Sequence, residues 1–292
     1  MPDIVATAPI SAAPPPAAPA TVDASGKALK TSAFKVPGAG NSATISVVTV
    51  VVLLLLWFLV TNMGWVKPLF LPSPQAVFQQ FYEYLTGQAN DKPLLHHFAA
   101  SMFRVFSAFV LACLTAIPVG IAMGMSRVMR GIFDPPLEFY RPLPPLAYLP
   151  LIVIWFGIEE TAKIVLIYLA CFAPLAMAAR AGVRSVTIEQ INAAYSMGAS
   201  KWQVIWHVVI PAALPEILTG MRIAIGFGWT TLVAAEMVAA TAGLGQMVLN
   251  ASNFLRTDVV IMGIVVIGVV AYLFDLLMRF VERRLVPWKG RV

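Results

Sequence analysis

Charged residues are scarce in this sequence, at 12% of its 292 residues, whereas hydrophobic residues make up 59%. Soluble domains carry about 25% charged residues. A single soluble core also cannot bury so many apolar runs, because one hydrophobic core does not keep growing as the chain becomes longer. The composition, with a mean hydropathy of +0.81, therefore excludes a soluble protein and indicates a membrane protein with several spans.

Cysteine and histidine are rare, with two and three residues. Cys113 and Cys171 lie inside apolar runs, where we expect small buried hydrophobic residues; a single disulfide is the alternative. The sequence has no CxxC pair and no Cys/His ligand spacing, which gives no support to a metal site. It also lacks the GxxxxGK[ST] phosphate-binding loop and the residue cluster that a membrane-embedded enzyme needs. We therefore expect no catalytic residues in this chain.

Six apolar runs predict membrane-spanning helices. They cover residues 45–62, 98–125, 146–157, 162–181, 217–240 and 259–281. The third run is brief and contains Pro150, and the pattern does not define its start. Residues 76–85 form a short amphipathic pattern, typical of a helix on the membrane surface or on the bundle.

The distribution of basic residues predicts the topology. With the N-terminus inside, 15 of the 20 Lys and Arg residues fall on the cytoplasmic side. This excess follows the positive-inside rule and favours six spans with both termini cytoplasmic. It also explains the net charge of +6 without a nucleic-acid partner. Residues 1–44, rich in Ala, Pro, Ser and Thr, are expected to be a disordered cytoplasmic tail and no cleaved signal peptide, and residues 45–292 the membrane domain.

The longest cytoplasmic connection, residues 183–215, contains the polar stretch NAAYSMGASKWQVIWHVVIP (192–211). Its pattern predicts a helix, a left-handed turn at Gly198, and a second amphipathic helix that ends at Pro211. The expected apolar faces consist of Ile188, Ile191 and Tyr195 and of Trp202, Ile205, Trp206 and Val209. Such an elbow (residues 188–211) is suited to docking on a partner outside the membrane; the alternative is that it packs on its own bundle.

The elbow resembles the cytoplasmic "EAA" loop of binding-protein-dependent ABC importer permeases. That pattern is Glu-Ala-Ala, three residues, Gly, nine residues and Ile-x-Leu-Pro. The matching residues are Asn192, Ala193, Ala194, Gly198, Val208, Ile210 and Pro211. Asn192 replaces the glutamate, Val208 the isoleucine and Ile210 the leucine. Strings such as LFLPSPQAVF, YRPLPPLAYLPLIVIWFG and GLGQMV extend the resemblance over roughly residues 65–292, to the nitrate/sulfonate/taurine subfamily.

The resemblance implies an all-α type I (MetI-like) importer permease in a bacterial inner membrane. This bundle has about six transmembrane helices, a core near residues 98–283 and a cytoplasmic coupling-helix loop. The implied partners are a second copy of the chain, two ATPase subunits, a periplasmic substrate-binding protein and membrane lipid. The chain itself is expected to bind no cofactor, because ATP and Mg bind in the ATPase subunits. The implied cargo is a small sulfonate, with taurine favoured and nitrate or an alkanesulfonate as alternatives.

Several residues outside the elbow are candidates for the pathway or a gate. Glu236 lies inside the fifth apolar run, where a carboxylate is costly and by default functional; we expect structural or gating use before cargo contact. The other candidates are Trp229, Thr230, Gly243 and Gly245.

Two further expectations concern charged residues. Arg104 and Arg256 are expected to anchor the chain at the outer interface, or to attract an anion. Asp275 and Arg279 are spaced to form an i,i+4 ion pair.

An ion-coupled secondary transporter is the alternative from another class. It needs paired ionisable residues at the membrane midplane and inverted repeats. The sequence has one deep carboxylate and no evident repeat, which disfavours that class.

Overall fold

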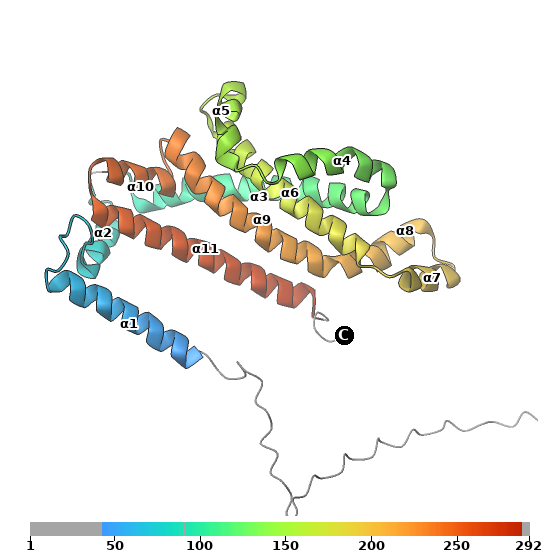
Figure 1. The fold of residues 1–292 in the computed structure, drawn as a ribbon, viewed down its shortest axis with the longest axis horizontal. Helices are drawn as coiled ribbons and strands as arrows, with labels where there is room; N and C mark the ends of the chain where they lie inside the picture. Colours follow the sequence, from blue (N-terminus) through green and yellow to red (C-terminus); the bar gives the residue numbers. More distant parts are fainter. Residues whose placement is uncertain (1–42, 90, 288–292) are drawn as a thin grey trace, which may run out of the picture. The chain divides into compact units, whose positions relative to one another are not determined.

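The computed structural model describes residues 43–89 and 91–287 (Figure 1). The chain divides into two units, residues 1–53 and 54–292, and each is described by itself. Most of the predicted tail, residues 1–42, lies outside the described residues. In the first unit the description begins with α1 (Ala43–Asn62), which continues into the second unit. The side chains of residues 44–53 are exposed all around this helix, as in a helix made for lipid.

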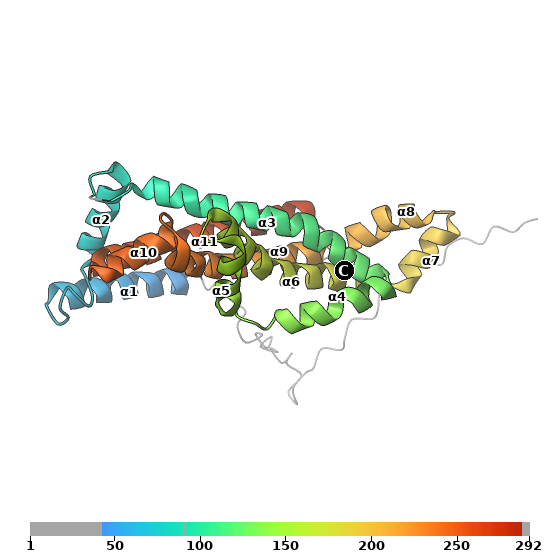
Figure 2. The ribbon, with the colours of Figure 1, turned by 90° about the horizontal axis from the view of Figure 1, so that it is seen from above.

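The described part of the second unit is helical. Its elements are α2 (Pro74–Thr86), α3 (Leu94–Met125), α4 (Arg127–Tyr140), α5 (Pro145–Phe156), α6 (Glu160–Arg184), α7 (Ile188–Ser196), α8 (Lys201–Val204), a π-helical turn (Ile205–Val209), α9 (Ile210–Ala239), α10 (Leu244–Asn253) and α11 (Thr257–Leu285). Figures 1 and 2 place α7 and α8 at one end of the bundle of α3, α6 and α9, and α10 at the other end.

Five helices in the described residues are long and apolar enough to cross a membrane. They correspond to five of the six predicted spans. The remaining span, predicted at residues 146–157, is the 12-residue helix α5. At about 1.5 Å per residue α5 covers about 18 Å, too little for a hydrocarbon core of about 30 Å.

A further helix, α4, lies along α6 in the connection between the second and third predicted spans. Asp134 of α4 forms an ion pair with Arg180, near the end of α6. The hydroxyl of Tyr140 donates a hydrogen bond to the Leu169 carbonyl, 3.3 Å away, further back along α6. The next helix, α5, then leads to Glu160, the first residue of α6. The chain thus returns along about 30 Å of α6 in two short helices, α4 and α5, instead of one long one.

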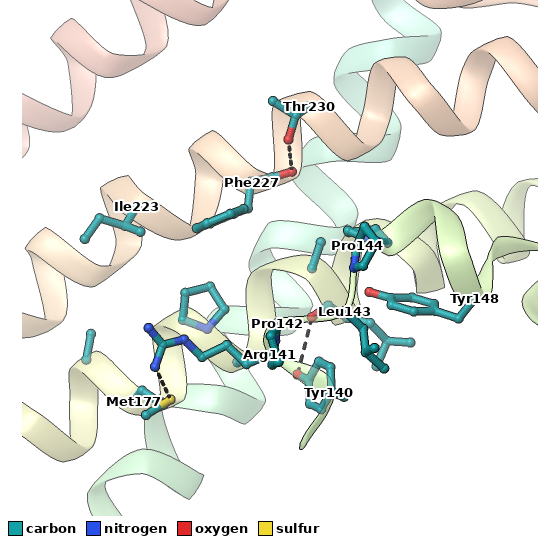
Figure 3. Close-up of a pocket in the computed structure, with 16 residues that line it drawn as sticks. Tyr140, Arg141, Pro142, Leu143, Pro144, Tyr148, Met177, Ile223, Phe227 and Thr230 are labelled. Atoms are coloured by element: carbon teal, nitrogen blue, oxygen red, sulfur yellow. Dashed lines mark hydrogen bonds between the residues drawn. The ribbon is translucent and has the colours of Figure 1, made fainter. Parts of the chain in front are cut away.

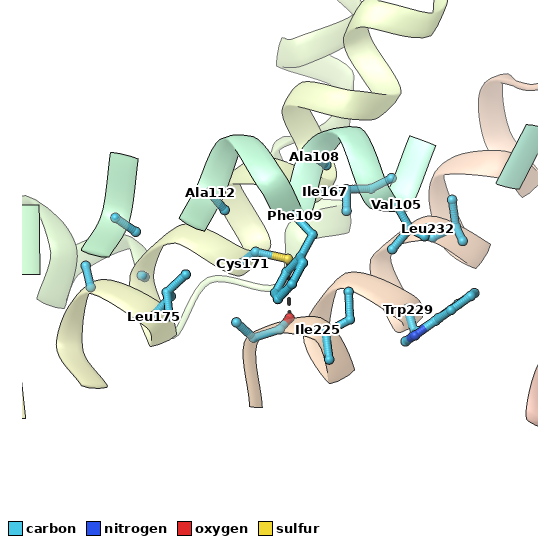
Figure 4. Close-up of a cluster of buried hydrophobic side chains, with 14 of the residues drawn as sticks. Val105, Ala108, Phe109, Ala112, Ile167, Cys171, Leu175, Ile225, Trp229 and Leu232 are labelled. Carbon is cyan, nitrogen blue, oxygen red and sulfur yellow. Dashed lines mark hydrogen bonds between the residues drawn. The ribbon is translucent and has the colours of Figure 1, made fainter. Parts of the chain in front are cut away.

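The core of the second unit forms where α3 packs on α6 and α6 packs on α9. Its small buried residues are Ala108, Ala112, Ala116, Ala173, Ala176 and Ala224. Small side chains let membrane helices approach closely, which matters because lipid tails provide no hydrophobic drive for association. Figure 4 shows Cys171 in this core, and its thiol donates to the Ala224 carbonyl at 3.3 Å. Cys113 and Cys171 are both free, so they do not form the alternative disulfide; Cys171 is buried as predicted, and Cys113 is half-buried.

Candidate functional site

The elbow is held by two capped helix starts and one left-handed turn. Thr187 and Gln190 form a reciprocal capping box at the start of α7, and Ser200 and Gln203 form another at the start of α8. Gly198 lies between them with φ = +82°, a conformation that favours glycine. Its backbone N–H donates to the Tyr195 carbonyl at 2.9 Å. The predicted turn at Gly198 is therefore confirmed.

The predicted end of the second helix at Pro211 is wrong. Residues 201–239 form one continuous helix that includes the π-helical turn and α9. In this turn the N–H of Ile210 donates to the carbonyl of Ile205, five residues back. A proline ring crowds the carbonyl four residues before it and offers no N–H. The wider π turn, placed directly before Pro211, provides room for the ring, so the helix passes through the proline.

The apolar residues of the elbow are divided between a packed side and an exposed side. Val204 and Val209 are buried in a cluster with residues of α6 and α9. Trp202 and Trp206, predicted on one face with Val209, are instead 71% and 62% exposed. Of the residues that match the EAA pattern, Asn192, Ala193 and Gly198 are exposed, Ala194 is buried, and Val208, Ile210 and Pro211 are half-buried. The elbow therefore packs on its bundle through one side and leaves an aromatic side uncovered.

A buried carboxylate lies at the opposite end of the bundle. Glu236, near the end of α9, is fully buried. Its Oε1 accepts hydrogen bonds from Arg104 Nη1 and Ser101 Oγ, both at 2.7 Å. Its Oε2 accepts the backbone N–H of Gly245 at 2.9 Å. Because a buried charge is costly unless it is paired and hydrogen-bonded, these contacts bind α3, α9 and the start of α10 together.

Arg104 connects this carboxylate to a second one. Its Nε and Nη2 donate to the two oxygens of Glu160 at 2.5 and 2.8 Å, in a bidentate pair. Its Nη1 also donates to the Ala242 carbonyl at 2.6 Å. Lys163 pairs with Glu160 at 2.9 Å, so two cations face two carboxylates. We call this group the polar clasp; it comprises Ser101, Arg104, Glu160, Lys163 and Glu236.

Gly243 covers the polar clasp with its backbone. His97 Nδ1 lies 3.0 Å from the Gly243 carbonyl and 3.1 Å from its N–H. Ser101 Oγ also accepts the N–H of Leu244 at 2.9 Å. Gly243 has φ = +139°, and a Cβ at this position would collide with the Glu236 carboxylate. The position therefore requires glycine for both conformation and space.

The structure brings three of the predicted gate residues together, namely Glu236, Gly243 and Gly245. It corrects the role expected for Arg104, which is 2% exposed and ion-paired instead of lying free at the outer interface. Sequence reasoning also missed Glu160. A cation ten residues into an apolar helix was the signal for Arg104, because a charge among apolar residues requires a partner.

A predicted ion pair at the other end of the bundle is confirmed. Asp275 and Arg279 of α11 approach to 2.7 Å. Arg222 of α9 joins them, at 3.2 Å from both Asp275 and Glu282. This contact fixes the register of α9 against α11.

A cavity of about 630 Å³ opens between the α4–α5 segment, α6 and α9 (Figure 3). Thr230 and Phe227 line it from α9, and Arg141 lines it from the segment after α4. Trp229 points elsewhere: it is buried in the core against Phe274, with ring centroids 6.4 Å apart. Of the two neighbouring pathway candidates, Thr230 therefore faces the cavity and Trp229 belongs to the core.

Comparisons with known proteins agree with this architecture. The family model for "Binding-protein-dependent transport system inner membrane component" matches residues 116–287. The taurine transport system permease protein TauC of Escherichia coli (strain K12) is 56% identical over 253 residues, which cover 86% of this chain and 92% of TauC. The putative aliphatic sulfonates transport permease protein SsuC of the same organism is 34% identical over 232 residues, covering 80% and 87%.

A solved structure supports the fold. A chain of the MetNI methionine ABC transporter in an inward-facing conformation matches with a TM-score of 0.55 at 19% identity. The match covers 64% of this chain and 93% of that chain. The chain therefore belongs to the family of binding-protein-dependent transport system inner membrane components, as an all-helical permease with the type I ABC importer fold.

Proposed function

We propose that this chain is the membrane subunit of an ATP-driven importer that carries a small sulfonate, with taurine as the cargo. The observation that carries this proposal is the 56% identity to TauC over 253 residues. Identity to the relatives named for aliphatic sulfonates and for bicarbonate is lower, at 34% and 31%. Taurine therefore precedes alkanesulfonates as the proposed cargo, and nitrate stays an alternative.

Coupling to ATP is proposed to occur through the elbow. The chain has no phosphate-binding loop of its own, so ATP and Mg are expected to bind to two separate ATPase subunits. The exposed side with Trp202 and Trp206 offers each ATPase an aromatic anchor of the kind that dominates interfaces. Since residues 201–239 are one helix, a displacement of these side chains also moves Thr230 and Glu236.

The proposed orientation places the elbow in the cytoplasm and the polar clasp at the periplasmic face of a bacterial inner membrane. Both termini are then cytoplasmic, in agreement with the excess of Lys and Arg on that side. A second copy completes a homodimer in the lipid bilayer, and a periplasmic binding protein delivers the cargo near the clasp.

The polar clasp does not favour ion-coupled transport. A proton or ion relay requires ionisable groups at the midplane. Glu160 is instead the first residue of α6, and Ala242 follows the end of α9, so the clasp lies at the ends of the spans. Its charges also neutralise each other. These contacts are consistent with a structural role, in which the clasp holds the outer ends of α3, α6 and α9 together.

The transport proposal is tested with the purified complex of permease, ATPase and binding protein in proteoliposomes. We expect taurine uptake that requires internal ATP, stops when the ATPase is inactivated, and persists with an ionophore. Excess alkanesulfonate or nitrate should compete weakly. Uptake that continues with an inactive ATPase and collapses with an ionophore indicates a secondary transporter. Stronger competition by nitrate or an alkanesulfonate than by taurine reassigns the cargo.

The docking role of the elbow has its own test. Trp202→Ala and Trp206→Ala together should weaken the permease–ATPase complex by about thirtyfold or more, because buried tryptophans at interfaces contribute about 2 kcal/mol or more. The folded permease should be unaffected, since both side chains are exposed. The measurement is recovery of the ATPase on immobilised permease. Trp65→Ala, at a 73% exposed tryptophan outside the elbow, is the matched control. Equal recovery in both variants contradicts docking through this face.

A further inference from the structure

Arg141 is an exposed cation that lines the cavity between the α4–α5 segment, α6 and α9, which we call the central cavity. Among the described residues that line the central cavity, it is the one charged side chain. The other basic side chains of the bundle, such as Arg104, Arg180 and Arg222, are paired with carboxylates. The hydrogen-bond partner found for the Arg141 guanidinium is the Met177 thioether, with Nη1 and Sδ 3.5 Å apart. No carboxylate in the described part of the chain lies within ion-pair distance of it.

The cavity lies at the middle of the spans. The side chain of Met177 and the carbonyl of Leu169 mark its level on α6. Leu169 lies about 13 Å and Met177 about 26 Å from the start of α6, a helix of about 37 Å at 1.5 Å per residue. Arg141 is exposed at this level and has no carboxylate partner among the described residues. Charged residues within membrane spans usually face the bundle interior or a water-filled cavity and mark substrate or ion pathways by default.

The rest of the lining suits the apolar and ammonium parts of a small organic ligand. Proline and aliphatic side chains form most of the wall, and the aromatic rings of Tyr148 and Phe227 face it from α5 and α9. The Thr230 hydroxyl donates to the Phe227 carbonyl at 2.9 Å, so its oxygen is left to accept a hydrogen bond from an N–H group of a ligand (Figure 3). A cavity of about 630 Å³ lies within the usual size range for small-molecule sites.

We propose that the central cavity is a transit site for the sulfonate group of the cargo, with Arg141 as its anion-binding residue. Guanidinium groups donate several hydrogen bonds in one plane and match the oxygens of oxyanions. In taurine, the ammonium group at the other end finds ring faces in Phe227 and Tyr148, where cations bind favourably. The lining has no carboxylate, so a cationic cargo is disfavoured. A single cation binds the sulfonate more weakly than several charged groups would, and weak binding lets the cargo leave the pathway.

This inference rests on the proposed transport function, and the test separates the two. Taurine uptake is measured in proteoliposomes that hold the complete complex, with saturating binding protein and internal ATP. Arg141→Gln should reduce uptake by about tenfold or more, in line with the loss of a charged hydrogen bond. Arg141→Lys, which keeps the charge, should retain more uptake than Arg141→Gln. Arg127→Gln, an exposed cation on α4 outside the cavity lining, is the matched control and should resemble the wild type.

A second pair of variants leaves Arg141 in place. Met177→Glu puts a carboxylate within reach of the guanidinium, and it should block uptake by occupying the anion site. Met177→Gln has nearly the same shape without the charge and should transport. If Arg141→Gln fails to assemble with the ATPase, this pair decides the question. Uptake by Met177→Glu equal to that by Met177→Gln, or by Arg141→Gln equal to wild type, overturns the site. A wild-type complex that imports no sulfonate instead overturns the transport function.

Discussion

Replacing Arg104 by methionine should destabilise the permease more than any surface change. It leaves the fully buried Glu236 carboxylate without its cation. Breaking one side of a buried ion pair costs about 3–5 kcal/mol, because the remaining charge has lost its compensation. We expect a large drop in the thermal unfolding midpoint of the purified permease and the loss of most uptake in proteoliposomes.

The matched control is Arg279→Met. Arg279 forms its ion pair with Asp275 at the surface, where its side chain is 50% exposed. Pairs of this kind contribute about 0–1 kcal/mol, so the unfolding midpoint should change little. The double variant Arg104→Met with Glu236→Met removes both charges of the buried pair and should recover part of the lost stability. Equal midpoints for Arg104→Met and Arg279→Met contradict the role of the polar clasp.

Gly198→Leu should uncouple ATP hydrolysis from uptake. The position has φ = +82°, which costs a leucine about 1–2 kcal/mol, and an added Cβ there contacts nothing within 4 Å. The substitution therefore changes the preferred angle of the turn without a clash or the loss of core packing. Because α7 and α8 meet at this turn, we expect the docking face to be misplaced. Uptake should fall by about tenfold or more while ATPase activity continues, since a misplaced contact no longer discriminates between two conformations.

Gly198→Asn provides the control, because asparagine tolerates the left-handed region better than other residues. It should keep most uptake. The measurement is the ratio of taurine imported to ATP hydrolysed, with insertion checked by membrane-fraction yield. A Gly198→Leu complex with the wild-type ratio indicates that the turn does not transmit movement.

Patterns local in the sequence predicted much of the fold. Five apolar runs are helices long and apolar enough to span a membrane, because length and hydrophobicity are enough to define a helix in lipid. The turn at Gly198 and the pair of Asp275 with Arg279 followed in the same way from neighbouring residues. The family pattern also placed the elbow correctly between the fourth and fifth predicted spans.

The remaining features depend on contacts between distant residues. Whether Pro211 ends a helix depends on a π turn that absorbs its ring, and no local signal marks that turn. The path of α4 along α6 depends on α6, which supplies Arg180 and the Leu169 carbonyl. Arg104 and Glu236 are separated by more than a hundred residues, so their pairing was not visible in the sequence. For the same reason the division of the elbow into packed and exposed sides appeared only in the structure.

The continuous helix of residues 201–239 has a thermodynamic consequence. It carries the exposed Trp206, the cavity residue Thr230 and the buried Glu236 on a single rod of about 58 Å. Binding energies linked through one body are reciprocal. Suppose that nucleotide bound to the ATPase at the Trp206 end alters the affinity for the delivery protein at the Glu236 end. The delivery protein must then alter the affinity for nucleotide by the same factor. A complex without a cargo-loaded delivery protein would then hydrolyse little ATP.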